Sequence, residues 1–169
     1  MDPGEALLGE FLGEASVSTS RPSAVLIHPH EVTMSAFTPA ELEYLGTQRL
    51  GRIATADASG QPHVVPVSFR YNSAEDAIEI GGHGGFAKRK KYRDVQQNPK
   101  AAFVVDDVVS VQPWKVRGIE IRGAIEIVPT GGSALGPGFD PEMFRLRPKR
   151  IVSWGIDGTM MQQNARSVG

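Results

Sequence analysis

One segment of the chain, residues 114–128, constrains the fold more than any other. Apolar and charged side chains alternate along it, with Ile119, Ile121, Ile125 and Ile127 in one set of positions and Glu120, Arg122 and Glu126 in the other. A two-residue period is typical of a strand with one buried and one exposed face. Gly123 interrupts the alternation, as a bulge or a barrel bend does. The segment therefore predicts a long strand in a sheet that covers a core on one side.

Shorter segments of strand character lie before and after this one. Strands are also predicted at residues 52–55, 63–71, 77–80, 101–105 and 150–154. Thr38, Pro39 and Glu41 form a helix start with a capping box, and Gly46 is a natural stop for that helix. A basic helix is predicted at 86–97 and a short one at 141–146. Many short strands with few helices indicate a mainly β fold, a small barrel closed chiefly by antiparallel strands.

The first 34 residues differ in composition from the rest of the chain. They are rich in Ser, Gly and Pro, and organised sequence begins just after Met34, which makes Met34 a candidate native start. Such a composition is typical of a flexible extension. We expect a flexible extension at 1–34, one barrel domain at 35–160 and a C-terminal tail at 161–169. A chain of 169 residues is suited to one domain.

The overall composition excludes several kinds of site and partner. The chain has no cysteines, which excludes disulfides, thiolate metal sites and a cysteine nucleophile. The formal net charge is -1, so no overall positive field attracts nucleic acid. No apolar run reaches the ~18 residues of a membrane span, and the N-terminus does not resemble a signal peptide. We therefore expect a cytoplasmic protein with no membrane or nucleic-acid partner.

The segment from Gly81 to Arg93 is the first candidate for binding chemistry. A glycine-rich stretch at 81–85 leads into a helix whose first turns are strongly basic. The basic residues are Lys88, Arg89, Lys90, Lys91 and Arg93. Free backbone N–H groups, a helix start and positive side chains together favour a phosphate or a related anion. A solvated basic helix face explains the same residues, and a nucleic-acid patch is a third interpretation. The spacing matches neither the dinucleotide fingerprint nor the Walker loop.

The second candidate is the segment Val65, Pro66, Val67 and Ser68. Proline has no backbone N–H to donate, so Pro66 indicates an edge strand or a bulge. A free backbone carbonyl or N–H at such a place suits a flat heterocycle. An ordinary edge strand explains the pattern equally well.

No catalytic constellation is evident in the sequence. The serines lack the flanking glycines of a nucleophile elbow, and no histidine pair has metal-ligand spacing beside a carboxylate. We therefore predict no metal site. Asp106 and Asp107 are best explained as a turn at a strand end. His83 is the one candidate for a catalytic role, as a proton donor to the reduced substrate. An anion site without a nucleophile indicates cofactor chemistry.

Taken in order, these segments resemble the pyridoxamine-phosphate-oxidase-like family, and more narrowly its F420-dependent branch from actinobacteria. The segments that carry the resemblance are FTPAE at 37–41, GRIAT at 51–55, GQPHVVPV at 60–67, KYRDVQQNPK at 91–100, RGAIEI at 122–127 and PKRIVSWG at 148–155. No single segment is specific to this family, but their order along the chain is.

The resemblance implies a split β-barrel and a homodimer with two cofactor sites between the protomers. It places the cofactor phosphate at Arg89 and Lys91. It places the ring system against the strand from Val65 to Phe69. Gly82 and His83 of the glycine-rich loop are further candidates for contact with the cofactor. Trp154 is carried over more weakly, from the other protomer. Many relatives have Ser or Thr in place of these glycines, which leaves the contacts there to backbone N–H groups.

The resemblance also implies a reductase that transfers a hydride from reduced F420 to an unsaturated organic substrate. Polycyclic natural-product enones and tetrapyrroles are the substrate classes that this branch suggests. F420 is favoured over FMN because its phosphodiester and glutamate tail carry several negative charges, which suit the basic residues at 88–93. An FMN-dependent oxidoreductase and a non-catalytic flavin- or F420-binding protein are the alternatives.

Overall fold

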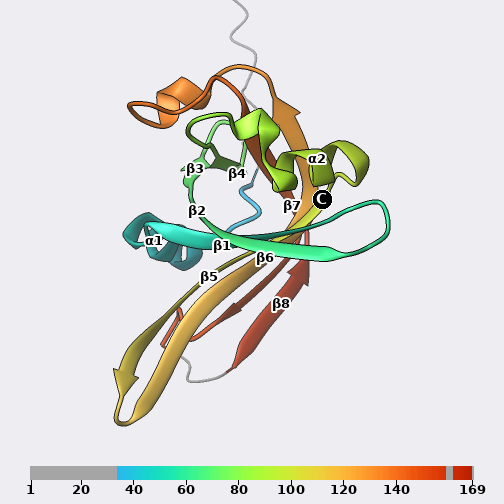
Figure 1. Ribbon diagram of the computed structural model, residues 1–169. Helices are drawn as coiled ribbons and strands as arrows, with labels where there is room; N and C mark the ends of the chain where they lie inside the picture. Colours follow the sequence, from blue (N-terminus) through green and yellow to red (C-terminus); the bar gives the residue numbers. More distant parts are fainter. Residues whose placement is uncertain (1–33, 159–161, 169) are drawn as a thin grey trace, which may run out of the picture. The chain divides into compact units, whose positions relative to one another are not determined.

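The computed structural model describes residues 34–158 and 162–168. Its strands are β1 (Leu50–Ala56), β2 (Pro62–Ser68), β3 (Arg70–Asn72), β4 (Ala77–Ile80), β5 (Lys100–Val111), β6 (Trp114–Val128), β7 (Met143–Trp154) and β8 (Gln163–Ser167). Its helices are α1 (Pro39–Thr47) and α2 (Lys90–Gln97), with 3-10 turns η1 (Phe86–Lys88) and η2 (Gly132–Leu135) (Figure 1). The expected flexible extension at 1–34 lies, apart from Met34, outside the described residues.

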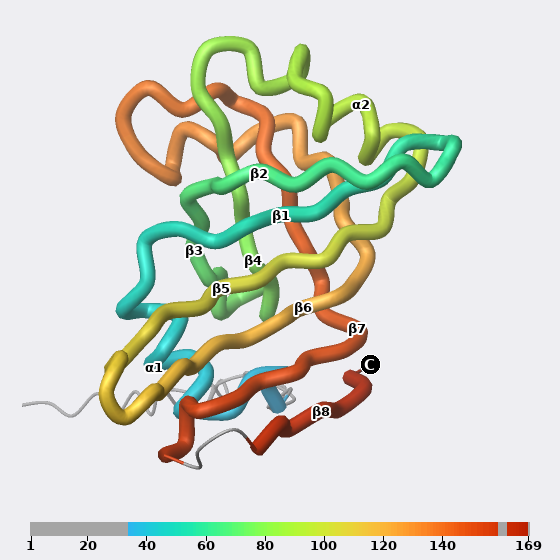
Figure 2. The backbone as a smooth tube through the Cα atoms, turned by 60° about the horizontal axis from the view of Figure 1, so that its bottom comes forward, coloured from blue at the N-terminus to red at the C-terminus, as the bar shows by residue number. Residues whose placement is uncertain are grey.

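The strands form one curled antiparallel sheet. Its order is β2-β1-β5-β6-β7-β4-β3, and β8 pairs with β7 beside this path. The two end strands, β2 and β3, are separated along the chain by Phe69 alone. The sheet therefore curls back on itself at this corner (Figure 2). The Phe69 ring packs edge-on against Phe103, at 5.1 Å between centroids, so the corner is fixed to the core. This arrangement is the split β-barrel that the sequence predicts.

The core lies inside the curl, on the face that the alternation predicts. Ile119 and Ile121 of β6 are fully buried and Ile125 is 3% exposed. Helix α1 closes one end of the curl through buried Tyr44 and Leu45. The predicted capping box of α1 is present: the Glu41 N–H donates to the Thr38 hydroxyl, and the Thr38 N–H donates to the Glu41 carboxylate. The helix continues through Gly46 to Thr47, one residue past the expected stop.

Gly123 stands at a register shift between β6 and β7, which confirms the predicted bulge. A Cβ at this position would lie 1.8 Å from the backbone oxygen of Arg147. Because a backbone atom cannot swing aside, Gly123→Ala should lower the free energy of unfolding by about 1–3 kcal/mol. Gly46→Ala is the control, since nothing lies within 4 Å of its Cβ. It should stabilise α1 by about 0.5–1 kcal/mol. Urea unfolding of both variants tests this, and equal shifts would contradict it.

Several sequence predictions need correction. Asp106 and Asp107 do not form a turn, because they lie within β5 and pair with β6. The strand predicted at 63–71 is divided at Phe69 into β2 and β3.

The short helix predicted at 141–146 is wrong, because Met143 to Trp154 form β7. Pairing with β6 on one side and β4 on the other buries Phe144 and Leu146 completely, and this pairing outweighs any local helical preference. The basic helix predicted at 86–97 is divided at Arg89, which has extended backbone between η1 and α2. The expected C-terminal tail contains β8, which the sequence analysis did not predict.

Within the part of the chain that the structure describes, no helix is long and apolar enough to cross a membrane.

Candidate functional site

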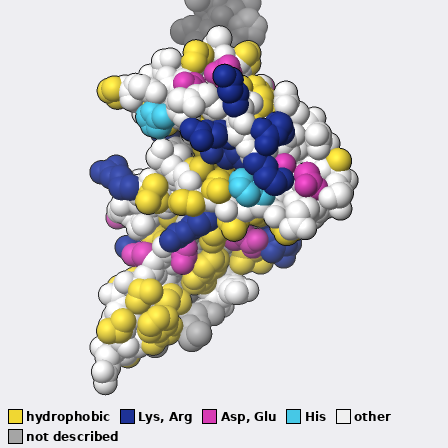
Figure 3. Space-filling view, viewed as in Figure 1, with side chains coloured by type: hydrophobic (Ala, Val, Ile, Leu, Met, Phe, Trp, Pro, Cys, Tyr) yellow, Lys and Arg dark blue, Asp and Glu magenta, His cyan; other side chains and the backbone are white. Residues whose placement is uncertain are grey.

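A pocket of about 470 Å³ lies between strand β2 and the segment that runs from the end of β4 into α2. It is lined by His63, Val65, Pro66, Val67, Ser68, Gly81, Gly82, His83, Phe86, Arg89, Lys90 and Lys91. Lys and Arg side chains gather around η1 and α2 on this face, with histidine side chains beside them (Figure 3). Apart from Trp154, every residue named from the sequence for the cofactor site lines this pocket. The pocket thus brings together, in one place, the edge strand, the glycine-rich loop and the basic helix that the sequence predicts for the site.

The wall formed by β2 is a free sheet edge. Strand β2 pairs with β1 in an unbroken antiparallel register and stands at the end of the strand order. An edge strand leaves about half of its backbone N–H and C=O groups directed away from its neighbour. Pro66 has no N–H to lose at such a place. The edge strand predicted from Pro66 is therefore confirmed, and residues 65–68 of this strand line the pocket.

The glycine-rich loop is shaped by a residue that sequence reasoning missed. Gly84 and Gly85 have φ of +61° and +90°, which favour glycine. The carboxylate of Asp140 accepts hydrogen bonds from the backbone N–H groups of Gly85 and Phe86, at 2.8 and 2.6 Å. These bonds, the one from Phe86 first, lower the pKa of Asp140. The expectation that the loop's N–H groups are left for a ligand is thus wrong for these two groups, because Asp140 already occupies them.

Unoccupied amides occur instead at the start of α2. Arg89 is its N-cap residue, and no side chain caps the helix. Among the described residues, no acceptor pairs with the backbone N–H groups of Lys90 and Lys91. The first N–H groups of a helix carry partial positive charge and bind anions readily. Within the described chain, the first turn of α2 therefore has two unpaired backbone N–H groups, whereas those of Gly85 and Phe86 are paired with Asp140.

The three cations at this helix start differ in their partners. Lys90 donates to the buried Asp94 at 2.8 Å and lies 3.6 Å from Asp57. Arg89 donates to the backbone oxygens of His83 and Gly84. The Lys91 ammonium lies 5.2 Å from the centroid of the Phe86 ring. Within the described chain, neither Arg89 nor Lys91 has a carboxylate partner, whereas Lys90 has two.

The surroundings of Lys91 disfavour its positive charge. Burial lowers the pKa of Lys91, and the positive charge of Arg89 lowers it further. Each effect disfavours the ammonium form, and a negatively charged ligand would relieve both. Arg89 and Lys91 thus lie together at the pocket, as the sequence predicts, and their binding of an anion stays a prediction.

The two histidines of the pocket are held differently. His83 is exposed; its Nδ1 lies 2.8 Å from the backbone oxygen of Gly138, and its ring lies 4.0 Å from that of Phe139. His63 of β2 was missed by the sequence analysis. It shares a strand face with Val65 and Val67, and this alternation is the signal that would have placed it in the pocket. Its Nδ1 lies 3.8 Å from Asp94 Oδ2.

Trp154 does not line this pocket in the described chain. It stands at the end of β7, where a Cβ on Gly118 would lie 2.4 Å from its ring. It lines two other hollows, one of them beside α1. A cofactor contact from Trp154 would therefore require a second copy of the chain, as the resemblance implies.

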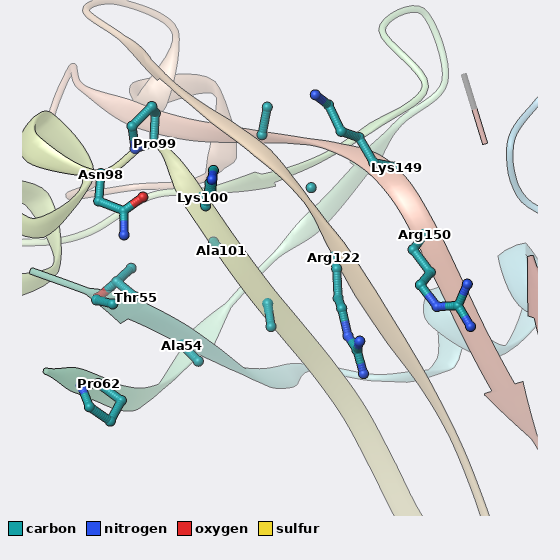
Figure 4. Close-up of a pocket in the computed structure, with 14 residues that line it drawn as sticks. Ala54, Thr55, Pro62, Asn98, Pro99, Lys100, Ala101, Arg122, Lys149 and Arg150 are labelled. Atoms are coloured by element: carbon teal, nitrogen blue, oxygen red, sulfur yellow. The ribbon is translucent and has the colours of Figure 1, made fainter. Parts of the chain in front are cut away.

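A larger groove of about 670 Å³ lies on the outer face of β1, β5, β6 and β7 (Figure 4). Small side chains, among them Ala54, Ala102 and Ala124, line its floor. Arg122 and Arg150 are opposite one another on β6 and β7 and project from the groove side by side. No histidine or carboxylate lines it, so it offers no group for proton transfer. We therefore assign binding chemistry to the smaller pocket.

The curled sheet with a pocket at its free edge defines the class of protein as a split β-barrel. The sequence pattern of the Pyridoxamine 5'-phosphate oxidase family matches residues 37–163. The chain is also 44% identical over 124 residues to the 5a,11a-dehydrotetracycline/5a,11a-dehydrooxytetracycline reductase of Streptomyces rimosus subsp. rimosus. That alignment covers 73% of this chain and 87% of the reductase. The chain belongs to the pyridoxamine 5'-phosphate oxidase family.

Solved structures share the fold at low sequence identity. A conserved hypothetical protein from Mycobacterium tuberculosis has a TM-score of 0.57 at 21% identity, covering 79% of this chain and 92% of that one. A pyridoxamine 5'-phosphate oxidase-related, FMN binding protein from Nostoc punctiforme has a TM-score of 0.54 at 10% identity, covering 80% and 100%. A heme binding protein from Mycobacterium smegmatis has a TM-score of 0.56 at 14% identity, covering 78% and 59%. At these identities the likeness establishes the fold alone.

Proposed function

We propose that this protein is an F420-dependent reductase that transfers a hydride to an unsaturated organic substrate. The observation that carries the proposal is the pocket at the free edge of β2, with the unpaired cations Arg89 and Lys91 at its α2 end. The relatedness to a dehydrotetracycline reductase supports an oxidoreductase that acts on a polycyclic natural product.

The residues present fit a phosphate-bearing cofactor with a flat ring. Lys91, Arg89 and the free amides at the start of α2 would hold the phosphate. The β2 edge from Val65 to Ser68 would lie against the ring, with Gly82 and His83 across from it. A bound reduced deazaflavin supplies a hydride. The role of the protein is to orient the two reactants and to exclude water, and hydride transfer needs placement more than an acid or a base.

The substrate class that we favour is a polycyclic enone. The relative from Streptomyces rimosus is a reductase of dehydrotetracyclines, and the alignment with it covers most of both chains. A tetrapyrrole is the second class, and it rests only on fold likeness to a heme binding protein. Stopped-flow oxidation of reduced F420 by a dehydrotetracycline would test the activity. Absence of any oxidation, with F420 bound, would leave a non-catalytic F420-binding protein.

Calorimetry should find that F420 binds at least about tenfold more tightly than FMN, a difference of about 1.4 kcal/mol. Arg89 and Lys91 have no carboxylate partners in the described chain, and Lys88 and Arg93 lie beside them. The phosphodiester and glutamate tail of F420 bring more negative charge to these cations than the single phosphate of FMN. Raising the salt concentration should narrow the difference, because exposed charges are screened. Micromolar FMN binding without detectable F420 binding would make the protein an FMN-dependent oxidoreductase instead.

We also propose a homodimer in which the outer groove of the sheet faces a second copy. Its floor is apolar and its wall contains the like charges Arg122 and Arg150 in directly opposed positions. Arg122 is already paired with Glu120, at 2.8 and 2.9 Å, but Arg150 has no carboxylate partner among the described residues and is suited to a second copy that brings negative charge. A second copy would also allow Trp154 to approach the cofactor pocket of its neighbour.

A further inference from the structure

His63 occupies an unusual position at the wall of the candidate pocket. About a quarter of its side chain, 27%, is exposed, while its Nδ1 atom is buried and has no hydrogen-bond partner. The nearest charged atom to this nitrogen that the structure gives is Asp94 Oδ2, at 3.8 Å. This distance is too long for a hydrogen bond but short enough for strong charge attraction. The second ring nitrogen, Nε2, has no hydrogen-bond partner among the described residues.

Asp94 is held in place and kept charged by its other partners. Its side chain is 3% exposed; Lys90 donates to Oδ1 at 2.8 Å, and the Thr55 hydroxyl donates to Oδ2 at 2.9 Å. Burial tends to raise the pKa of Asp94, but the hydrogen bonds from Lys90 and Thr55 outweigh it and the pKa is lowered. The oxygen that faces His63 is therefore a fixed, negatively charged acceptor with Thr55 as its one donor.

The charged and polar groups behind the His63 ring come from three elements. Helix α2 contributes Asp94 and Lys90, and the turn after β1 contributes Asp57, which lies 3.6 Å from Lys90. Strand β1 contributes the neutral Thr55, opposite His63 in the register. On the pocket side, Arg89 and Lys91 line the same wall as His63, so the carboxylates lie behind the ring and the free cations lie in front of it.

We propose that His63, held against Asp94, donates the proton that completes reduction of the substrate in this pocket. This inference rests on the proposed function. Reduced deazaflavin, when bound here, would supply two electrons as a hydride to the β-carbon of an enone. The C=C electron pair would then form an enolate, and His63, as imidazolium, would transfer its proton to that enolate. His63 is left as neutral imidazole and regains a proton from water, so atoms and charges balance.

His83, the residue suspected from the sequence, is less suited to this task. Its Nδ1 contacts a neutral backbone oxygen, that of Gly138, and no carboxylate is its partner in the described chain. His63 instead faces the buried carboxylate of Asp94, at 3.8 Å from its Nδ1 atom. A small movement of the ring would bring the two groups into hydrogen-bond distance, the geometry in which a carboxylate orients an imidazole for proton transfer.

The first test compares His63→Gln with Gln61→Ala in single-turnover reactions of bound reduced F420 with a dehydrotetracycline. Gln61 is an exposed turn residue of the same hairpin, outside the pocket. His63→Gln should form product about a hundredfold or more slowly, with cofactor affinity unchanged, and Gln61→Ala should match the wild type. The wild type should show a solvent deuterium isotope effect on product formation that His63→Gln alters.

The second test uses the protein without cofactor and follows the ring nitrogens of His63 by NMR. The pairing predicts a proton on Nδ1, toward Asp94, and a shift of the Nδ1 signal in Asp94→Asn. Thr55→Val, which leaves Oδ2 to His63 alone, should move the signal in the opposite direction. Thr55→Val still tests the pairing of His63 with Asp94 if Asp94→Asn does not fold.

The outcomes separate this inference from the proposed function. Failure of the wild type to bind F420 overturns the proposed function and, with it, the proton transfer in an F420-dependent reaction. Normal cofactor binding and turnover, with an unaffected rate in His63→Gln, overturns only the role of His63. Ring-nitrogen signals that do not respond to Asp94→Asn or Thr55→Val overturn the pairing.

Discussion

Replacing Glu79 with alanine should lower the free energy of unfolding by about 3–5 kcal/mol. Glu79 is 1% exposed and accepts hydrogen bonds from Arg70 and Asn72 at 2.8 Å each and from Arg145 at 3.1 Å. Without it, Arg145 loses a buried partner while its Nε atom is already without one. Among the described carboxylates, Arg145 keeps only the partly exposed Glu75, at 3.3 Å, and removing one partner of a buried ion pair costs more than the loss of the attraction itself. Chemical denaturation monitored by circular dichroism measures the change.

Glu75→Ala is the matched control for this prediction. Glu75 also pairs with Arg145, at 3.3 Å, and with Arg147, at 2.7 Å, but its side chain is 36% exposed. Exposed ion pairs contribute about 0–1 kcal/mol, so Glu75→Ala should cost less than about 1 kcal/mol. Equal losses for the two variants would show that burial of the Glu79 carboxylate does not govern the effect.

The same cluster should make the protein sensitive to acid. Burial tends to raise the pKa of Glu79, but hydrogen bonds from Arg70, Asn72 and Arg145 outweigh it, and the pKa is lowered from its ordinary 4.5. A group whose pKa is lower in the folded state stabilises the fold fully above its unfolded pKa. That contribution is lost as the pH falls through the folded pKa. Glu79→Ala should therefore reduce the dependence of stability on pH below about 4.5.

Glu79 also connects the barrel to the pocket. Arg70, one of its partners, donates a second hydrogen bond to the backbone oxygen of Ala134 in η2. The loop that follows η2 carries Asp140, which accepts from the amides of Gly85 and Phe86. Without Glu79, Arg70 would lose its carboxylate partner and would hold η2, and the loop that follows it, less firmly. Cofactor affinity should therefore weaken in Glu79→Ala as well as stability.

The sequence predicts those parts of the fold whose signal is local. The alternation gives the bounds of β6 and its buried face, because a two-residue period is visible within one strand. Pro66 indicates a free edge, because a missing N–H is tolerated there. The local sequence at 141–146 favours a helix, whereas the strand Met143 to Trp154 is determined by its pairing with β4 and β6, which are distant in sequence.

The candidate site follows the same division. Residues that line the pocket could be proposed from glycine, basic and edge-strand patterns, each confined to a short segment. Asp140 and Asp94 could not, because their roles depend on contacts with Gly85 and His63 across the fold. Lys90 and Lys91 point about 100° apart on a helix, so the two side chains should not both face one phosphate. The structure adds a stronger reason, since only Lys90 is paired with Asp94.

Lys91→Ala should weaken binding of the phosphate-bearing cofactor by about ten- to a hundredfold, whereas Lys90→Ala should weaken it much less. A hydrogen bond to a charged group is worth about 1.5–3 kcal/mol, which corresponds to this range. Lys91 lines the pocket without a carboxylate partner in the described chain, and burial lowers its pKa. The charge of Lys90 is already compensated by Asp94 and Asp57, so little of it reaches a ligand.

Calorimetric titration of both variants with F420 and with FMN measures these losses, after thermal melting has confirmed that each variant is folded. The melting step matters for Lys90→Ala, because it leaves the buried Asp94 without its ammonium partner and should reduce stability more than Lys91→Ala. The two lysines should therefore show opposite orders of effect, with Lys91 dominant in binding and Lys90 dominant in stability. Equal, small losses of affinity would mean that the start of α2 is a solvated basic surface and that the anion binds elsewhere.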